Sequence, residues 1–73
     1  MATILILDRT GDTRQHFDPS ASEQLAWANA RFQELTADGY TAAKRRSTGE
    51  PEIIRTLDPT AEETLFYPRL VGG

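Results

Sequence analysis

Apolar residues recur at helical spacing in one long stretch of the chain, between residues 21 and 37. The apolar residues of this stretch fall on one stripe of a helix: Ala21, Leu25, Ala28, Phe32 and Leu35. Ser20 is placed to cap the N-terminus, Glu23 completes a capping box, and Gly39 is placed to end the helix. The sequence therefore predicts one helix from about Ala21 to Ala37, whose apolar stripe packs against the rest of the chain.

Short runs with strand character surround this helix. The expected strands are Thr3 to Leu7, Thr13 to Phe17, Tyr40 to Arg46, Glu52 to Leu57 and Thr64 to Arg69, with a single helical turn capped by Thr60 before the last. This order predicts an α+β domain, a mixed sheet with one helix packed on one face. The very apolar first strand suits a central position, parallel to the last strand.

The helical stripe and the alternation of the first and last strands predict one core between helix and sheet. Its expected members are Ile4, Ile6, Phe17, Leu25, Ala28, Phe32, Leu35, Leu65 and Tyr67. A chain of 73 residues makes one domain, and it has little room for a substrate pocket beside such a core. The size therefore argues against a self-contained enzyme.

Composition excludes several kinds of chemistry. The chain has no cysteine, so it has no disulfide, thiolate ligand or thiol nucleophile. Its net charge of −3 argues against a nucleic-acid binder. The first residues lack a basic leader and a span-length apolar run, so we expect a cytoplasmic protein that does not enter a membrane. The single histidine, His16, is expected to be an ordinary strand residue, and no catalytic residue, metal or cofactor is expected.

Two further features have two interpretations each. Lys44-Arg45-Arg46 is either the solvated end of a hairpin or a docking patch. Trp27 lies off the apolar stripe of the helix. Its ring either folds over the sheet edge or stands exposed as an anchor for a partner, since tryptophan is enriched at binding hot spots.

The sequence ends in Gly72-Gly73, directly after the last expected strand. Together with other features, this ending resembles the ubiquitin-like β-grasp modifiers. The shared features are Thr10-Gly11 in the first turn, Asp18-Pro19-Ser20 before the helix, Leu25, Ala28 and Phe32 along it, the short turn before Thr64-Leu65, and Arg69-Leu70-Val71-Gly72-Gly73. The chain is most similar to the bacterial ubiquitin-like proteins that are encoded with activating, conjugating and JAB-type deconjugating enzymes. The resemblance implies a β-grasp domain over residues 1–71 and a flexible tail, Gly72 and Gly73.

The same resemblance implies a function. The carboxylate of Gly73 would be adenylated with ATP on an activating (ThiF-type) enzyme, pass to a thioester, and join target amines through isopeptide bonds. Conjugating enzyme, JAB-type peptidase and target proteins are the further expected partners. Arg69, Leu70 and Val71 would serve tail recognition, and Lys44, the only lysine, would serve chain linkage. Leu5, Phe66 and Pro68, with Trp27, are what the sequence offers as a partner surface.

Pro68 departs from the family pattern, because a proline in the last strand is expected to end its pairing early. Two other functions also fit the sequence. A sulfur carrier would use the same tail to form a C-terminal thiocarboxylate. A β-grasp interaction module would have an inert tail.

Overall fold

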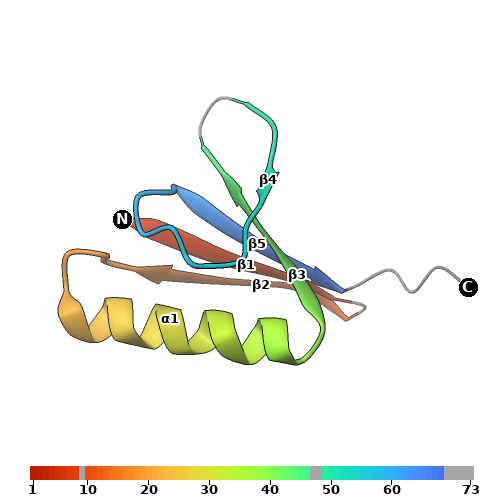
Figure 1. The fold of residues 1–73 in the computed structure, drawn as a ribbon, viewed down its shortest axis with the longest axis horizontal. Helices are drawn as coiled ribbons and strands as arrows, with labels where there is room; N and C mark the ends of the chain where they lie inside the picture. Colours follow the sequence, from red (N-terminus) through yellow and green to blue (C-terminus); the bar gives the residue numbers. More distant parts are fainter. Residues whose placement is uncertain (9, 47–48, 69–73) are drawn as a thin grey trace, which may run out of the picture.

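The computed structural model describes residues 1–8, 10–46 and 49–68. The elements follow in the order β1 (Ala2–Asp8), β2 (Gly11–Phe17), α1 (Ser22–Ala37), β3 (Tyr40–Arg45), β4 (Glu52–Ile53) and β5 (Glu63–Pro68). The strands form one five-stranded sheet, and α1 covers one of its faces (Figure 1). This arrangement confirms the predicted α+β class.

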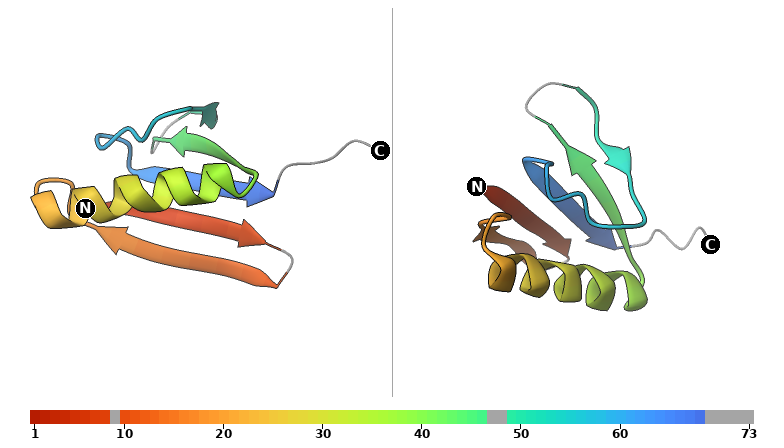
Figure 2. Two further views of the ribbon diagram at one scale, coloured as in Figure 1. Left: turned by 60° about the horizontal axis from the view of Figure 1, so that its bottom comes forward. Right: turned by 60° about the vertical axis from the view of Figure 1, so that its left-hand side comes forward.

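The strand order in the sheet is β2-β1-β5-β3-β4. β1 pairs antiparallel with β2 and parallel with β5, and β3 pairs antiparallel with both β5 and β4. β1 and β5 therefore lie side by side inside the sheet (Figure 2). Strands in this position have neighbours on both sides, which favours apolar sequences such as theirs. The topology is β-grasp-like, and the predicted parallel pairing of the first and last strands is confirmed.

The helix begins one residue later than predicted, and its N-terminus lacks the predicted side-chain cap. Ala21 is the N-cap residue, and among the described residues no side chain caps it. Ser20 instead donates two hydrogen bonds to Oδ1 of Asp18, from its N–H at 2.9 Å and from its hydroxyl at 2.6 Å. Gly39 follows the helix with a φ of +100°, a conformation that favours glycine, so the predicted end is confirmed. Among the described residues, no helix has the length and apolar character that crossing a membrane requires.

One core fills the space between α1 and the sheet. Its buried members are Ala2, Ile4, Ile6, Phe17, Ala28, Phe32, Leu35, Ala42 and Phe66. The rings of Phe32 and Phe66 meet edge to face, with centroids 5.4 Å apart. Leu25 packs against this core from a partly buried position. Most of the predicted core is therefore confirmed.

The prediction for β5 chose the wrong face. Leu65 and Tyr67 were expected in the helix-facing core, but they belong to a second cluster on the opposite face of the sheet. Phe66 was expected on a partner surface, but it is completely buried under α1. The pairing of Ile6 with Phe66 puts these two side chains on the same face. Because residues 65 to 67 are all apolar, alternation alone does not select a face, whereas the pairing with β1 does.

The second hairpin is shorter than predicted. β4 contains only two residues, and Ile53 there is 69 % exposed. Ile54 points the other way, packs against the helix-facing core, and donates its N–H to the carbonyl oxygen of Ala42 at 3.0 Å. Two adjacent isoleucines in extended chain necessarily point to opposite faces.

The predicted helical turn before β5 is a hydrogen-bonded turn without helix. Thr60 does not cap it. Its N–H and hydroxyl donate to Oδ1 of Asp58 at 2.9 and 2.6 Å. The aspartate is the acceptor here, as Asp18 is before α1, because a short aspartate side chain readily accepts from the residue two positions on.

Candidate functional site

The end of β5 is the part of the described structure that leads to the predicted tail. β5 runs to Pro68, which is exposed and pairs with Tyr40 of β3. The pairing with β3 therefore includes the proline, whereas the register with β1 extends only to Phe66. The predicted tail residues lie outside the described residues: Arg69, Leu70, Val71, Gly72 and Gly73.

The sheet face opposite α1 carries a second apolar cluster, which we call the outer apolar strip. It consists of Leu5, Ala43 and Leu65, with Leu7 and Tyr67 packed against them. The first three expose only 8 %, 1 % and 9 % of their surface. Leu5 is therefore largely covered, and the half-buried Leu7 and Tyr67 are the accessible members of the strip.

The outer apolar strip corrects the predicted partner surface. Phe66 contributes nothing to it, and Leu5 contributes little. Pro68 is exposed, but it pairs with Tyr40, which packs against the helix-facing core, so Pro68 lies on the other face of the sheet. Leu7 was not predicted for this surface, and Tyr67 was predicted for the helix-facing core. The signal that could have found Leu7 is that both faces of the first strand are apolar, which requires cover on both faces of the sheet.

Polar side chains of β2 border the outer apolar strip. Cross-strand pairs place Asp12 beside Leu7, Arg14 beside Leu5 and His16 beside Thr3. Nδ1 of His16 lies 3.0 Å from the hydroxyl oxygen of Thr3, within hydrogen-bond distance. Within residues 1–8, 10–46 and 49–68 no group of three or more histidine, cysteine, aspartate or glutamate side chains is arranged to hold a metal ion.

Lys44, the predicted linkage residue, has its amine engaged in ion pairs. Its Nζ lies 2.8 Å from Oδ2 of Asp58 and 3.4 Å from a carboxylate oxygen of Glu52. The hydrogen bond to Asp58 raises the pKa of Lys44, and Glu52 acts in the same direction. The same bond, helped by the donors of Thr60, lowers the pKa of Asp58 well below its usual range. To act as a nucleophile, this amine has to leave its partners and lose its proton.

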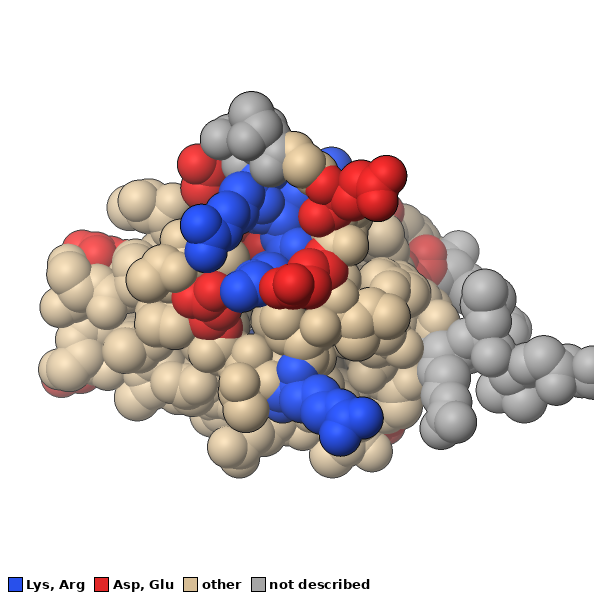
Figure 3. All heavy atoms as spheres, turned by 45° about the horizontal axis from the view of Figure 1, so that its top comes forward, with Lys and Arg blue, Asp and Glu red and all other residues tan. Residues whose placement is uncertain are grey.

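The basic run of residues 44 to 46 does not form a basic patch. Arg45 pairs with Glu63, and Lys44 pairs with Asp58 and Glu52, so acidic and basic side chains are interspersed on this surface (Figure 3). The hydrogen-bonded partners neutralise most of the local charge. The structure therefore favours the solvated end of a hairpin over a docking patch.

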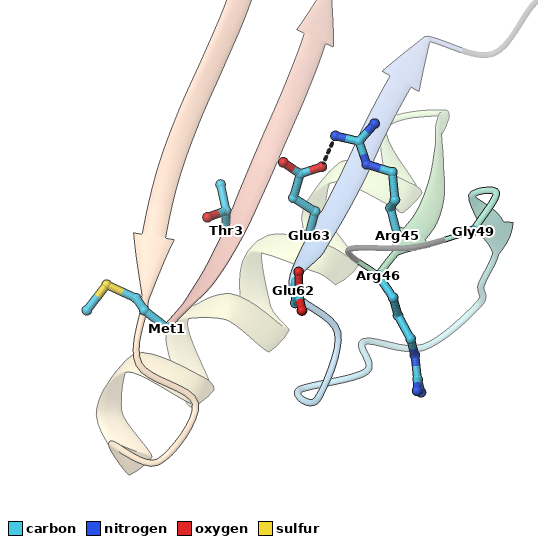
Figure 4. A pocket seen from close by; sticks show the side chains of 7 residues that line it. All are labelled: Met1, Thr3, Arg45, Arg46, Gly49, Glu62 and Glu63. Carbon is cyan, nitrogen blue, oxygen red and sulfur yellow. Dashed lines mark hydrogen bonds and ion pairs between the residues drawn. The ribbon is translucent and has the colours of Figure 1, made fainter.

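A polar hollow of about 700 Å³ lies beside the ion pair of Arg45 and Glu63. Met1, Thr3, Arg45, Arg46, Gly49, Glu62 and Glu63 line it. Figure 4 shows that Arg46 points away from the pair formed by Arg45 and Glu63. The hollow lies at the start of β5, at the opposite end of that strand from Pro68. It therefore does not border the predicted tail.

Trp27 lies on the side of α1 that faces the edge strand β2. Its side chain lies next to Gln15 of β2, and the residue is 41 % exposed. It separates two shallow hollows of about 380 and 300 Å³ between α1 and β2. The residue therefore lies beside the edge strand with part of its surface accessible, and its role as an anchor for a partner stays a prediction.

Comparison with known proteins finds no match: no family model matches the chain, and neither a curated protein nor a solved structure is significantly similar to it. The class that the structure itself defines is a small α+β domain with β-grasp-like topology.

Proposed function

We propose that this protein is a ubiquitin-like modifier whose reacting group is the carboxylate of Gly73. The observation that carries the proposal is the position of β5. It is an inner strand of a β-grasp-like sheet, and it ends at Pro68, five residues before Gly73 in the sequence. The accessible residues of the outer apolar strip lie at this same end, since β1 and β5 are parallel and Leu7 is near the end of β1.

The chemistry requires a free and slender chain end. An oxygen of the Gly73 carboxylate attacks the α-phosphorus of ATP on the activating enzyme, and pyrophosphate leaves. A thiolate of that enzyme then attacks the acyl-adenylate carbonyl and expels AMP. A target amine finally displaces the thiolate and forms the isopeptide bond. Glycine has no Cβ, so each nucleophile can approach the carbonyl closely.

In this proposal the protein is the acyl group that is carried, and the catalysts are its partners. The chain has no cysteine and so cannot itself hold the thioester. Residues 69 to 73, when extended, span at most about 17 Å, enough to reach a catalytic centre while the domain docks elsewhere. Leu7 and Tyr67 are the surface we propose for docking the activating enzyme, the conjugating enzyme and the JAB-type peptidase in the cytoplasm.

Two tail variants test this proposal. We expect deletion of Gly73, or Gly72→Val, to abolish ATP–pyrophosphate exchange by the cognate activating enzyme. A β-branched side chain at position 72 restricts the backbone and widens a chain that has to enter a narrow channel. Ala26→Val is the matched control, because it adds the same branched side chain at an exposed helical position. Circular dichroism establishes that each variant is folded. Exchange at the wild-type rate by folded tail variants would show that Gly73 does not react.

The sulfur-carrier function uses the same adenylate and is separated by its product. Mass spectrometry of protein from its native cell distinguishes the two. A C-terminal gain equal to the mass difference between sulfur and oxygen identifies a thiocarboxylate, whereas attachment to lysine side chains identifies a modifier. A cellular role that persists without Gly72 and Gly73 identifies the interaction module.

A further inference from the structure

The strand β2 forms one edge of the sheet. Among the described strands only β1 pairs with it, so its outer side presents unpaired backbone donors and acceptors (Figure 2). Most of its residues, from Gly11 to Arg14 and also His16, are exposed. It is as long as β1, with seven residues, and no proline interrupts it. Two of the devices that protect an edge, a short strand and a proline, are therefore missing from β2, and its charged residues, Asp12 and Arg14, are of opposite sign.

The space between this edge and α1 is incompletely filled. The two shallow hollows beside Trp27 are lined by Gln15 of β2 and by residues of α1. Oε1 of Gln15 is buried, yet it has no hydrogen-bond partner among the described residues. A buried acceptor without a donor is unfavourable, so the packing of β2 against α1 is incomplete at this place. The exposed Trp27 and the unpaired oxygen of Gln15 thus lie in the same incompletely filled region between β2 and α1.

The charges of β2 specify which chain fits. Asp12, Arg14 and His16 share the outer face of the sheet, since they pair with Leu7, Leu5 and Thr3 of β1. When two copies of β2 pair antiparallel around a two-fold axis, residues opposite one another lie on the same face. An axis at Thr13 places Asp12 of each copy opposite Arg14 of the other. The neighbouring registers instead place Asp12 opposite Asp12, or Arg14 opposite Arg14, which is repulsive.

We propose that the free edge of β2 binds β2 of a second copy of this chain, in the register centred on Thr13. The two sheets then continue into one another, and both helices lie on the same side of the joined sheet. Each Trp27 faces the other copy across the junction, where the hollows beside it close. Backbone hydrogen bonds supply affinity, and the two Asp12–Arg14 pairs select the register. This inference does not depend on the tail or on the proposed function.

The first experiment measures association of the full-length protein. We expect sedimentation equilibrium to show a monomer–dimer equilibrium between low-micromolar and millimolar concentration. Trp27 is the only tryptophan, so its emission reports on the junction and should shift to the blue as the dimer forms. A protein that stays monomeric up to millimolar concentration overturns the proposal.

Charge reversal tests the register. Arg14→Asp places like charges opposite one another, and so does Asp12→Arg, and each should weaken self-association about tenfold or more. An equimolar mixture of the two variants restores opposite charges at both pairs, so the mixture should form a heterodimer. Arg55→Asp is the control for Arg14→Asp, because Arg55 is exposed and follows β4, at the far edge of the sheet. Folded variants that dimerise as the wild type does, or a mixture that does not associate, would refute the register.

Discussion

Phe66→Leu tests the assignment of the two faces of β5. Phe66 is completely buried, and its ring meets Phe32 edge to face with centroids 5.4 Å apart. The aromatic contact contributes about 0.5–1.5 kcal/mol beyond burial, and complete truncation of a buried phenylalanine costs about 3–5 kcal/mol. Leucine retains much of the apolar volume, so we expect Phe66→Leu to lower the free energy of unfolding by about 1–3 kcal/mol.

That loss is large for a domain of this size. A chain of 73 residues has a free energy of unfolding of roughly 4–11 kcal/mol. Urea denaturation followed by circular dichroism resolves the expected change. The matched control is Tyr67→Leu, which makes the same aromatic-to-leucine change one residue later, on the outer face. We expect it to cost less than about 1 kcal/mol, because Tyr67 is only partly buried. If Tyr67→Leu costs as much as Phe66→Leu, the assignment of the faces is wrong.

Two further predictions concern single residues. Gly39→Ala should destabilise the protein by about 1–2 kcal/mol in urea, because φ is +100° there and the added Cβ meets no neighbour that could compensate or clash; an unchanged midpoint would contradict this. The pKa of Asp58 is lowered in the folded protein, so its contribution is complete above the unfolded pKa near 4 and is lost as the pH falls below about 4. Asp58→Asn should therefore make the urea midpoint fall less steeply as the pH drops below about 4. Some slope should remain, because the pKa values of Asp8 and Asp18 are also lowered. An unchanged slope would show that the Lys44–Asp58 pair does not cause the loss of stability in acid.

The proposed modifier function and the proposed dimer rest on different parts of the chain. The function depends on Gly72 and Gly73, which are known from the sequence and lie outside the described residues. The dimer depends on β2, for which the structure supplies the edge position, the face that Asp12 and Arg14 share, and the neighbouring Trp27. Dimerisation through β2 does not involve β5, because β1 lies between the two strands in the sheet. Either proposal can therefore fail without the other.

The sequence by itself determined the elements and their order. The helical stripe of residues 21 to 37, the strand-like first run and Gly39 are local signals, because helical spacing and backbone preference act over a few neighbouring residues. Each predicted an element that the structure contains. The apolar first strand also indicated its inner position and its parallel partner, since few positions in a small sheet accept a strand that is apolar on both faces.

Only the tertiary structure decided toward which face of the sheet each residue of β5 points. Residues 65 to 67 are all apolar, so either face was compatible with their pattern until the pairing with β1 put Phe66 under α1. Lys44 and Asp58 are 14 positions apart, so no local pattern predicted their hydrogen bond or its effect on the predicted linkage site. Such contacts depend on how distant segments meet in the folded chain, and sequence periodicity carries no information about that meeting.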